Sequence, residues 1–197
     1  MSFKVILADP AWKFDNRGNR FSPDYAGAYK TTKNDQIIDM GADVRSVAAD
    51  DALLFLWCPN ALILEGVGSA CCLSWGFEPK QLSPWLKTCA DGETPRIGGG
   101  NYTRACTEQM ILATRGRAAP LVKDRGVPGV IESIEDLAIE PIRAPRSAHS
   151  AKPDEAYRLI ERLVDGPYLE LFARRRWSEQ WTVLGDEAPG AGAGRIA

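Results

Sequence analysis

Apolar residues occur along the chain in two patterns, short runs rich in apolar residues and longer stretches with one apolar face. The runs, which predict buried strands, span residues 3–8, 52–57, 81–87, 108–114, 168–172 and 181–184, with a shorter one near 130–133. The stretches with helical spacing, which predict helices, span residues 34–49, 59–76 and 153–163. Strands that alternate with helices in this way predict an α/β fold, in which helices cover both faces of a central, mostly parallel sheet.

Two long segments between these elements have no periodicity, residues 13–33 and the glycine-rich residues 89–103. Segments of that length inside a compact domain are usually functional or disordered, and we expect both to be loops that close over a ligand. A chain of 197 residues has the size of one domain. Residues 1–187 are therefore expected to form a single domain, followed by a flexible tail over residues 188–197.

Composition narrows the class of protein. No apolar run approaches the roughly 20 residues that a membrane helix needs, and the first apolar run is too short for a signal peptide. The five cysteines are odd in number, include the adjacent pair Cys71 and Cys72, and form no CxxC pair, which argues against a disulfide framework and a zinc site. With His149 as the single histidine, we expect a cytoplasmic protein without metal or membrane.

The net charge of −2 does not describe a polycation, but the basic residues are clustered. Residues 96–125 hold six basic side chains against two acidic ones, and Arg174, Arg175 and Arg176 form a second cluster. Solvated surface charge is the ordinary interpretation of such clusters. The alternative interpretation is a local face that binds phosphates.

The first candidate site is Asp9-Pro10-Ala11-Trp12, directly after the first predicted strand. The exocyclic amine of adenine is a poor nucleophile because its lone pair is conjugated with the ring. The Asp9 carboxylate and the Pro10 carbonyl could accept its two N–H groups and free the lone pair, while Trp12 offers a stacking surface. The alternative is a strand-ending turn with a core tryptophan.

The second candidate site lies where the last helix and strands meet. Ligands of open α/β sheets bind at the carboxyl ends of strands, where Glu170 and the residues after Phe172 are expected. The helix that starts at Lys152-Pro153 has a proline in its first turn. A lysine beside the positive end of a helix suits a carboxylate ligand.

With these motifs in order, the chain resembles the MT-A family of adenine N6-methyltransferases. That family carries Asp-Pro-Pro-Trp, so Ala11 replaces its second proline. The other matching blocks, which cover nearly the whole chain, are Tyr29 before Thr31-Thr32, Phe55-Leu56-Trp57, Trp85-Leu86-Lys87, Gly100-Asn101-Tyr102 through Glu108 and Arg115-Gly116, His149-Ser150-Ala151-Lys152-Pro153-Asp154-Glu155, Glu170-Leu171-Phe172-Ala173-Arg174, and Leu184-Gly185.

The resemblance implies a Rossmann-like methyltransferase fold with a permuted motif order, in which the target motif precedes the cofactor block. It implies S-adenosylmethionine as the cofactor, and no metal. Residues with an implied catalytic role are Asp9, Pro10 and Trp12; with the substrate, Tyr29, Lys87, Asn101 and Arg104; and with the cofactor, Asp9, Lys152, Glu170, Arg174, Asp186 and Glu187. Asp186 and Glu187 stand where the family has Asn-Gln, which is a departure from its pattern.

The resemblance also implies direct methyl transfer to N6 of an adenine that has left its base stack. DNA is favoured over RNA as the substrate because the chain is short, like prokaryotic or phage members of the family. A homodimer or a partner subunit would supply further nucleic-acid surface. Three alternatives stay open at this point: the same chemistry on RNA, a non-catalytic nucleic-acid-binding subunit, and methylation of a small molecule or protein amide.

Overall fold

The structure, a computed structural model, describes residues 2–13, 32–89, 94–95, 97, 102–128, 142–145 and 152–185. Seven strands of this part form one sheet; they are β1 (Phe3–Ala8), β2 (Ala48–Cys58), β3 (Glu78–Thr88), β4 (Thr107–Arg115), β5 (Ile142–Pro145), β6 (Tyr168–Leu171) and β7 (Trp181–Leu184). Their spatial order is β5-β3-β4-β2-β1-β6-β7. β4 runs antiparallel to β2 and β3, and the other four pairings are parallel. The predicted mostly parallel sheet is confirmed.

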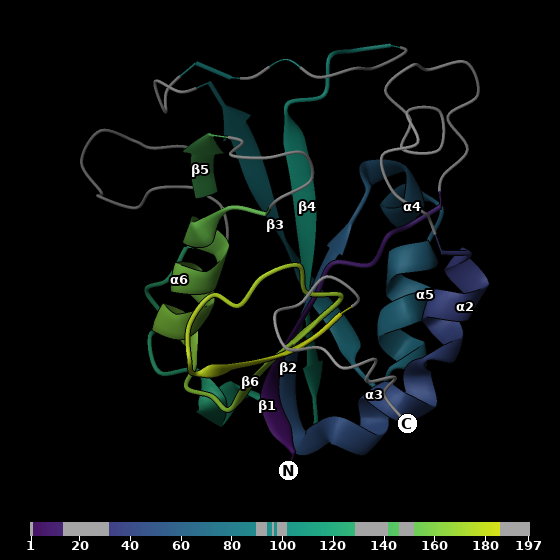
Figure 1. Ribbon diagram of the computed structural model, residues 1–197, viewed down its shortest axis with the longest axis vertical. Coiled ribbons are helices and arrows are strands. Elements are labelled where there is room, and N and C mark those ends of the chain that lie inside the picture. Colours follow the sequence, from purple (N-terminus) through teal and green to yellow (C-terminus); the bar gives the residue numbers. More distant parts are fainter. Residues whose placement is uncertain are drawn as a thin grey trace.

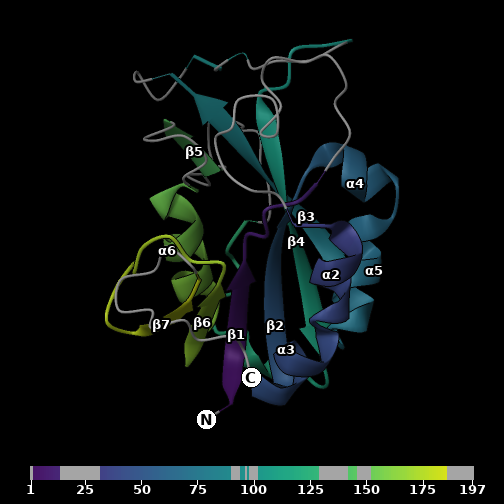
Figure 2. The same ribbon diagram turned by 45° about the vertical axis from the view of Figure 1, so that its right-hand side comes forward.

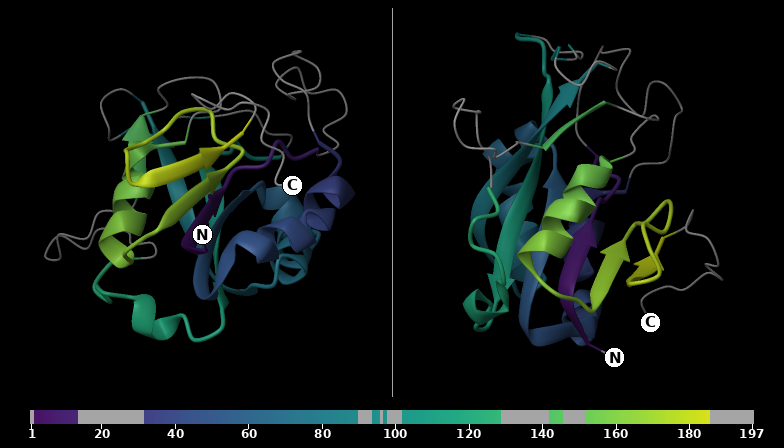
Figure 3. Two further views of the ribbon diagram at one scale, coloured as in Figure 1. Left: turned by 60° about the horizontal axis from the view of Figure 1, so that its bottom comes forward. Right: turned by 90° about the vertical axis from the view of Figure 1, so that its left-hand side faces the viewer.

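Helices cover both faces of this sheet, as Figures 1 and 2 show. One face carries α2 (Asn34–Asp39), α3 (Gly41–Val47), α4 (Asn60–Leu64) and α5 (Val67–Ser74). The other face carries α6 (Asp154–Leu163), which precedes β6, and Figure 3 shows α6 and the blue helices on opposite sides of the strands. This layering is that of a Rossmann-like methyltransferase fold.

The strand order reverses between β1 and β6. After β1 the chain passes through α2 and α3 to β2 on one side, whereas β6 and β7 are added late on the other side. In open α/β sheets, the crevice at the carboxyl end of such a switch point is the usual place for a ligand. The fold therefore points to the residues that directly follow β1 and β6.

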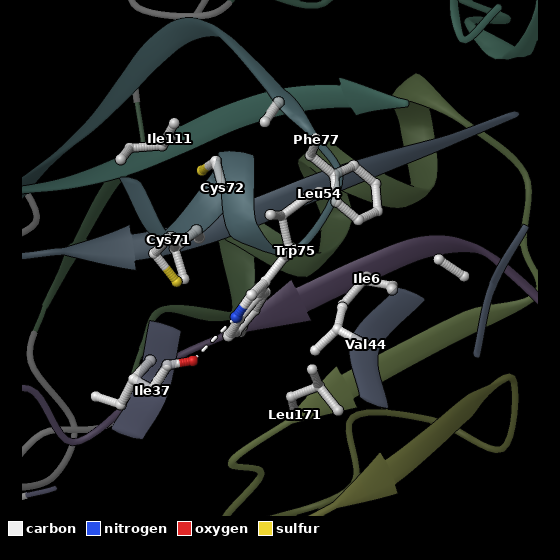
Figure 4. Packing of buried hydrophobic residues seen from close by; sticks show 14 of the residues in the cluster. Ile6, Ile37, Val44, Leu54, Cys71, Cys72, Trp75, Phe77, Ile111 and Leu171 are labelled. Atoms are coloured by element: carbon white, nitrogen blue, oxygen red, sulfur yellow. Dashed lines mark hydrogen bonds between the residues drawn. The ribbon is translucent and has the colours of Figure 1, made fainter. Parts of the chain in front are cut away.

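Strict alternation of side chains divides the core into two clusters. Figure 4 shows part of the cluster beneath α2 to α5, where Trp75 is fully buried and its indole N–H donates to the carbonyl of Ile37 at 3.0 Å. The cluster beneath α6 is aromatic: Tyr168 stacks on Trp181 with ring centroids 4.8 Å apart, and Tyr157 meets Trp181 edge-on at 5.2 Å. Both faces of β1 and β2 are thus filled, which explains their runs rich in apolar residues.

The two predicted long helices are each interrupted. The helix expected over residues 34–49 breaks at Met40 and ends at Val47, because Gly41 lies so close to α5 that a Cβ there would be 2.4 Å from the Ser74 carbonyl oxygen. The helix expected over residues 59–76 breaks at Gly66, which has φ of 80°. A left-handed residue of this kind ends a helical turn and suits glycine.

One strand of the sheet was not predicted, and two predicted segments lie outside the described residues. β5 was not predicted, because a four-residue strand that ends in Pro145 has no apolar run and depends on pairing with β3. The strand expected near 130–133 and the tail over 188–197 lie outside the described residues. The five cysteines are free in the structure. In the described ranges no helix has the length and apolar character to cross a bilayer.

We expect Trp75→Phe to destabilise the protein by about 2–3 kcal/mol, because it removes a buried hydrogen bond and leaves a small cavity. The measurement is urea unfolding followed by circular dichroism. Leu73→Ala, at a side chain of α5 that is 61% exposed, is the control and should change stability by no more than about 0.5 kcal/mol. Equal losses in the two variants would contradict the assignment of Trp75 to the core.

Candidate active site

The strand register places a row of side chains on the α6 face at the carboxyl edge of the sheet. Leu7 of β1 lies opposite Glu170 of β6 and Phe55 of β2, and Leu7 and Phe55 both belong to the core beneath α6. Because side chains alternate along a strand, Asp9 and Trp57, two positions further on, are on this same face. Glu170 of β6, Trp57 of β2 and Asp9, which directly follows β1, therefore share one face, with Asp9 and Trp57 one step nearer the carboxyl edge than Glu170.

The antiparallel strand β4 extends this row. Trp85 of β3 lies directly opposite Glu108 of β4, so the two side chains share a face, and Lys87 follows Trp85 on that face. Trp85 and Trp57 meet edge-on with ring centroids 6.1 Å apart. The indole rings form an apolar floor beneath the charged groups.

Hydrogen bonds hold the turn after β1 in place. The N–H of Asp9 donates to the Leu171 carbonyl at 3.5 Å, which ties the turn to the end of β6. The N–H of Trp12 donates to the Pro10 carbonyl at 2.8 Å, and the Trp12 indole N–H donates to the Trp57 carbonyl at 2.7 Å. Trp12 is 3% exposed and packs in the core, so its contribution here is to fix the turn. The expected stacking of a base on Trp12 stays a prediction.

A chain of ionic contacts crosses the row. The ammonium of Lys152, from the segment before α6, lies 2.8 Å from Oδ2 of Asp9 and 3.4 Å from Oε2 of Glu108. Oε1 of the same glutamate pairs with the ammonium of Lys87. Each lysine also lies over an indole, Lys152 at 5.5 Å from the Trp57 centroid and Lys87 at 5.4 Å from the Trp85 centroid. Lys152 is 12% exposed, so water screens these contacts only in part.

Burial and neighbouring charges set the pKa values of Asp9, Glu108 and Lys152. Burial raises the pKa of Asp9 above its ordinary value, and the Lys152 ammonium only partly opposes this. For Glu108 burial acts in the same direction, but Lys152 and Lys87 together outweigh it and lower the pKa. Burial would lower the pKa of Lys152, yet Asp9 and Glu108 outweigh it and raise the pKa. Lys152 is thus a permanent cation held between two acids.

Glu170 occupies a different environment in the same row. Its side chain is 6% exposed, Oε1 accepts a hydrogen bond from the Tyr157 hydroxyl at 2.8 Å, and the buried Oε2 has no partner within the described residues. Burial raises the pKa of Glu170 to about 7, against the lowering effect of the Tyr157 hydrogen bond. A buried acceptor without a donor is costly, so Oε2 is suited to accept from a ligand hydroxyl or amine.

The chain turns sharply after β6. Phe172 has φ of 62°, and a Cβ at Gly185 would come within 2.3 Å of the Ala173 carbonyl oxygen. The left-handed conformation of a non-glycine residue is uncommon and frequent at ligand sites. Arg174 follows this turn at the surface, and its charge acts to lower the pKa of Asp9, so the basic cluster begins next to the row.

The structure brings together five of the predicted site residues. Asp9 and Lys152 are in contact, Lys87 joins them through Glu108, and Glu170 and Arg174 lie beside Asp9. Arg104 is exposed between residues 102 and 107, and its expected role stays a prediction. Tyr29, Asn101, Asp186 and Glu187 lie outside the described residues. In the described part no group of His, Cys, Asp or Glu side chains is arranged to hold a metal ion.

Three residues of the site were not assigned a role from the sequence: Trp57, Glu108 and Tyr157. Trp57 forms the floor under Lys152, Glu108 shares that lysine with Asp9, and Tyr157 donates to Glu170. Glu108 lies in one of the blocks that match the family, but its position in the sequence alone indicates no role. Tyr157 gave no signal, since it reads as one more apolar position of a helix.

Comparison with known proteins identifies the family of this chain. A family model described as MT-A70 matches residues 3–187. The chain belongs to the MT-A70 family. The resemblance drawn from the motifs is therefore confirmed, and it accounts for the permuted arrangement in which Asp9 follows the first strand and Lys152 precedes the last helix.

MT-A70 relatives come from animals and bacteria. The chain is 28% identical over 191 residues to an N(6)-adenosine-methyltransferase MT-A70-like protein of Drosophila melanogaster, and 27% identical over 192 residues to the N(6)-adenosine-methyltransferase catalytic subunit METTL3 of Homo sapiens. Each match covers 95% of this chain but only 27% and 28% of the relative. The type II methyltransferase M.MunI of Mycoplasma sp is 27% identical over 207 residues, which cover 95% of this chain and 78% of the relative.

We expect Lys152→Met to destabilise the protein by about 1–2 kcal/mol at pH 8, because Asp9 and Glu108 lose the cation between them; both side chains are partly exposed, so the value is below that of fully buried pairs. Without the ammonium Asp9 keeps a pKa that burial raises above its unfolded value, and its penalty disappears as the pH falls and it becomes protonated. Urea unfolding at pH 8 and pH 5 measures this. A deficit that grows toward pH 5 would contradict the assigned network.

Proposed function

We propose that this chain transfers a methyl group from S-adenosylmethionine to the N6 amino group of adenine in nucleic acid, and that the nucleic acid is DNA. The observation that carries the proposal is the contact between Asp9 and Lys152 at the strand switch point, near the Glu170 oxygen that has no partner among the described residues. This arrangement offers an acceptor for an amine, a cation for a carboxylate and an acceptor for hydroxyls within one row.

Asp9 and Pro10 are proposed to hold the acceptor amine. Oδ2 of Asp9 is engaged by Lys152, and its second oxygen, Oδ1, can accept an N–H of the amine. The Pro10 carbonyl, whose direction is fixed by the Trp12 N–H, has a second lone pair for the other N–H. Two such bonds draw the nitrogen out of conjugation with the ring, and positioning supplies much of the rate.

The cofactor is proposed to bind across the end of β6. When bound, S-adenosylmethionine supplies an electrophilic methyl group on a sulfonium. Lys152 would hold its carboxylate, and Oε2 of Glu170, which lacks a donor within the described residues, would accept from ribose hydroxyls. Arg174 would border this site, and Asp186 and Glu187 are proposed to contact the adenosine part.

DNA is favoured as the polymer by the proportions of the relatives. The match covers 78% of the type II methyltransferase M.MunI but 28% of METTL3, so this chain matches most of the bacterial relative and a smaller part of the other. The target base must leave its stack to reach Asp9. Lys87 and Arg104, together with Tyr29 and Asn101, are proposed to contact the substrate, and a second copy or a partner subunit is proposed to extend the surface.

The first test is an assay of methylation with labelled S-adenosylmethionine and matched DNA and RNA oligonucleotides, single- and double-stranded, followed by mass spectrometry of the nucleosides. We expect N6-methyldeoxyadenosine, reduced at least about 100-fold in Asp9→Ala because a positioned hydrogen-bond acceptor is lost. Asp165→Ala, at an aspartate that is 78% exposed, is the control and should be fully active. N6-methyladenosine in RNA alone would move the substrate to RNA, and full activity of Asp9→Ala would overturn the proposal.

The second test uses the pH dependence of cofactor affinity. Glu170, with its pKa raised to about 7, must be ionised to accept hydroxyls with both oxygens, so affinity should be about tenfold weaker at pH 6 than at pH 8. Titration calorimetry with S-adenosylmethionine measures this. Tyr157→Phe removes the hydrogen bond that lowers the pKa of Glu170, and should move the decline to higher pH. Affinity that strengthens on acidification would contradict the role given to Glu170.

A further inference from the structure

We propose that Lys152 has two carboxylate acceptors, Asp9 and Glu108, and that Glu108 takes over its ammonium when the target amine binds to Asp9. The inference rests on the proposed methyl transfer and adds a positioning residue to it. It assigns a function to Glu108, an acid on the antiparallel strand β4 that does not belong to either motif of the site.

The geometry places Lys152 between the two acids. Its Nζ atom is 2.8 Å from Oδ2 of Asp9 and 3.4 Å from Oε2 of Glu108, so the first contact is a full hydrogen bond and the second is a looser ion pair. A displacement of well under 1 Å along the line between the acids exchanges the two contacts. The ammonium lies over the Trp57 ring in this position, and the ring face keeps attracting it during the displacement.

Asp9 becomes a stronger hydrogen-bond acceptor when Lys152 moves away from it. An ammonium at hydrogen-bond distance withdraws electron density from a carboxylate and makes it a weaker acceptor for a second donor. The amine of adenine needs the opposite, a strong acceptor that polarises its N–H. Transfer of Lys152 toward Glu108 strengthens Asp9 as an acceptor at the moment when the amine arrives, and it leaves no cation without a partner in the low-dielectric site.

Glu108 is arranged for this task by Lys87. Lys87 pairs with Oε1 and thereby fixes the carboxylate so that Oε2 faces Lys152. Because Lys87 neutralises part of its charge, Glu108 competes with Asp9 for Lys152 without removing it in the absence of substrate. The two acids and two lysines thus form a balanced chain, with Lys152 nearer to Asp9.

Four charged groups face Asp9: Lys152 before α6, Glu108 on β4, Glu170 on β6 and Arg174 after β6. Lys152 and Arg174 act to lower the pKa of Asp9, and Glu108 acts to raise it. Loss of the Glu108 charge should therefore lower the pKa of Asp9. Loss of Lys87 should raise it, because Glu108 then draws Lys152 away from Asp9.

The experiment compares the wild type with Glu108→Gln and Lys87→Met by two measurements. The first is the pKa of Asp9, obtained from carboxyl carbon chemical shifts in the free protein. The second is kcat for methylation of a DNA oligonucleotide as a function of pH, with the dissociation constant of S-adenosylmethionine measured alongside. Glu78→Gln, which alters an exposed glutamate paired with Lys80 at the other end of β3, is the matched control.

In Glu108→Gln we expect kcat to fall about tenfold at neutral pH, a moderate share of the effect of a positioned acid or base, while the cofactor dissociation constant changes less than twofold. The acid limb of the kcat profile and the pKa of Asp9 should both move to lower pH. In Lys87→Met both should move to higher pH, and in Glu78→Gln neither should move. Loss of folding alone would lower kcat at every pH without opposite shifts of the limb.

The experiment distinguishes failure of the proposed methyl transfer from failure of the proposed role of Glu108. A folded wild type that binds S-adenosylmethionine and methylates neither DNA nor RNA would overturn the proposed function, and the role of Glu108 with it. A wild type that methylates adenine, together with a Glu108→Gln variant whose kcat and acid limb are unchanged, would overturn only the transfer of Lys152 to Glu108.

Discussion

The ion pair between Lys152 and Asp9 is the contact on which the arrangement of the site depends. Asp9 follows the first strand and Lys152 precedes the last helix, so the pair joins segments that are 143 positions apart in the sequence. The parallel pairing of β1 with β6 brings the two segments together, and the N–H of Asp9 bonds to the end of β6. A lysine so little exposed needs carboxylate partners, and here it has two. The pair therefore forms only when β1, β6 and the segment before α6 have come together in the folded protein.

The alternation of apolar runs and amphipathic stretches was sufficient to predict the layers of the fold. β1, β4 and α6 lie within about one residue of their expected positions, because each is a single run with clear ends. Predictions failed where tertiary contacts decide the local structure. Gly41 breaks a helix because α5 lies against it, and β5 exists because β3 offers an unpaired edge. Neither reason is visible in a window of neighbouring residues.

The site was predictable to the extent that it resides in motifs. Asp9, Lys152 and Glu170 could be proposed from the sequence because Asp9 follows the first strand, Lys152 precedes the last helix and Glu170 lies near the end of a late strand, where ligands bind. Glu108 was missed because its importance comes from a register: it faces Trp85 across an antiparallel pair, and no spacing in the sequence shows that pairing. The indole N–H of Trp12 holds the turn by donating to the Trp57 carbonyl, a contact between distant segments that the sequence does not show, and the stacking of a base on Trp12 stays a prediction.

The pKa values of the acids in the row shift in opposite directions at its two ends. At the end formed by β3 and β4, two lysines face Glu108 and lower its pKa. At the end formed by β1 and β6, burial raises the pKa of both Asp9 and Glu170, and the charge of Asp9 raises the pKa of Glu170 further. Acids with raised pKa values mark a place where added positive charge is stabilising. A cationic ligand such as the sulfonium we propose would meet that need at β1 and β6.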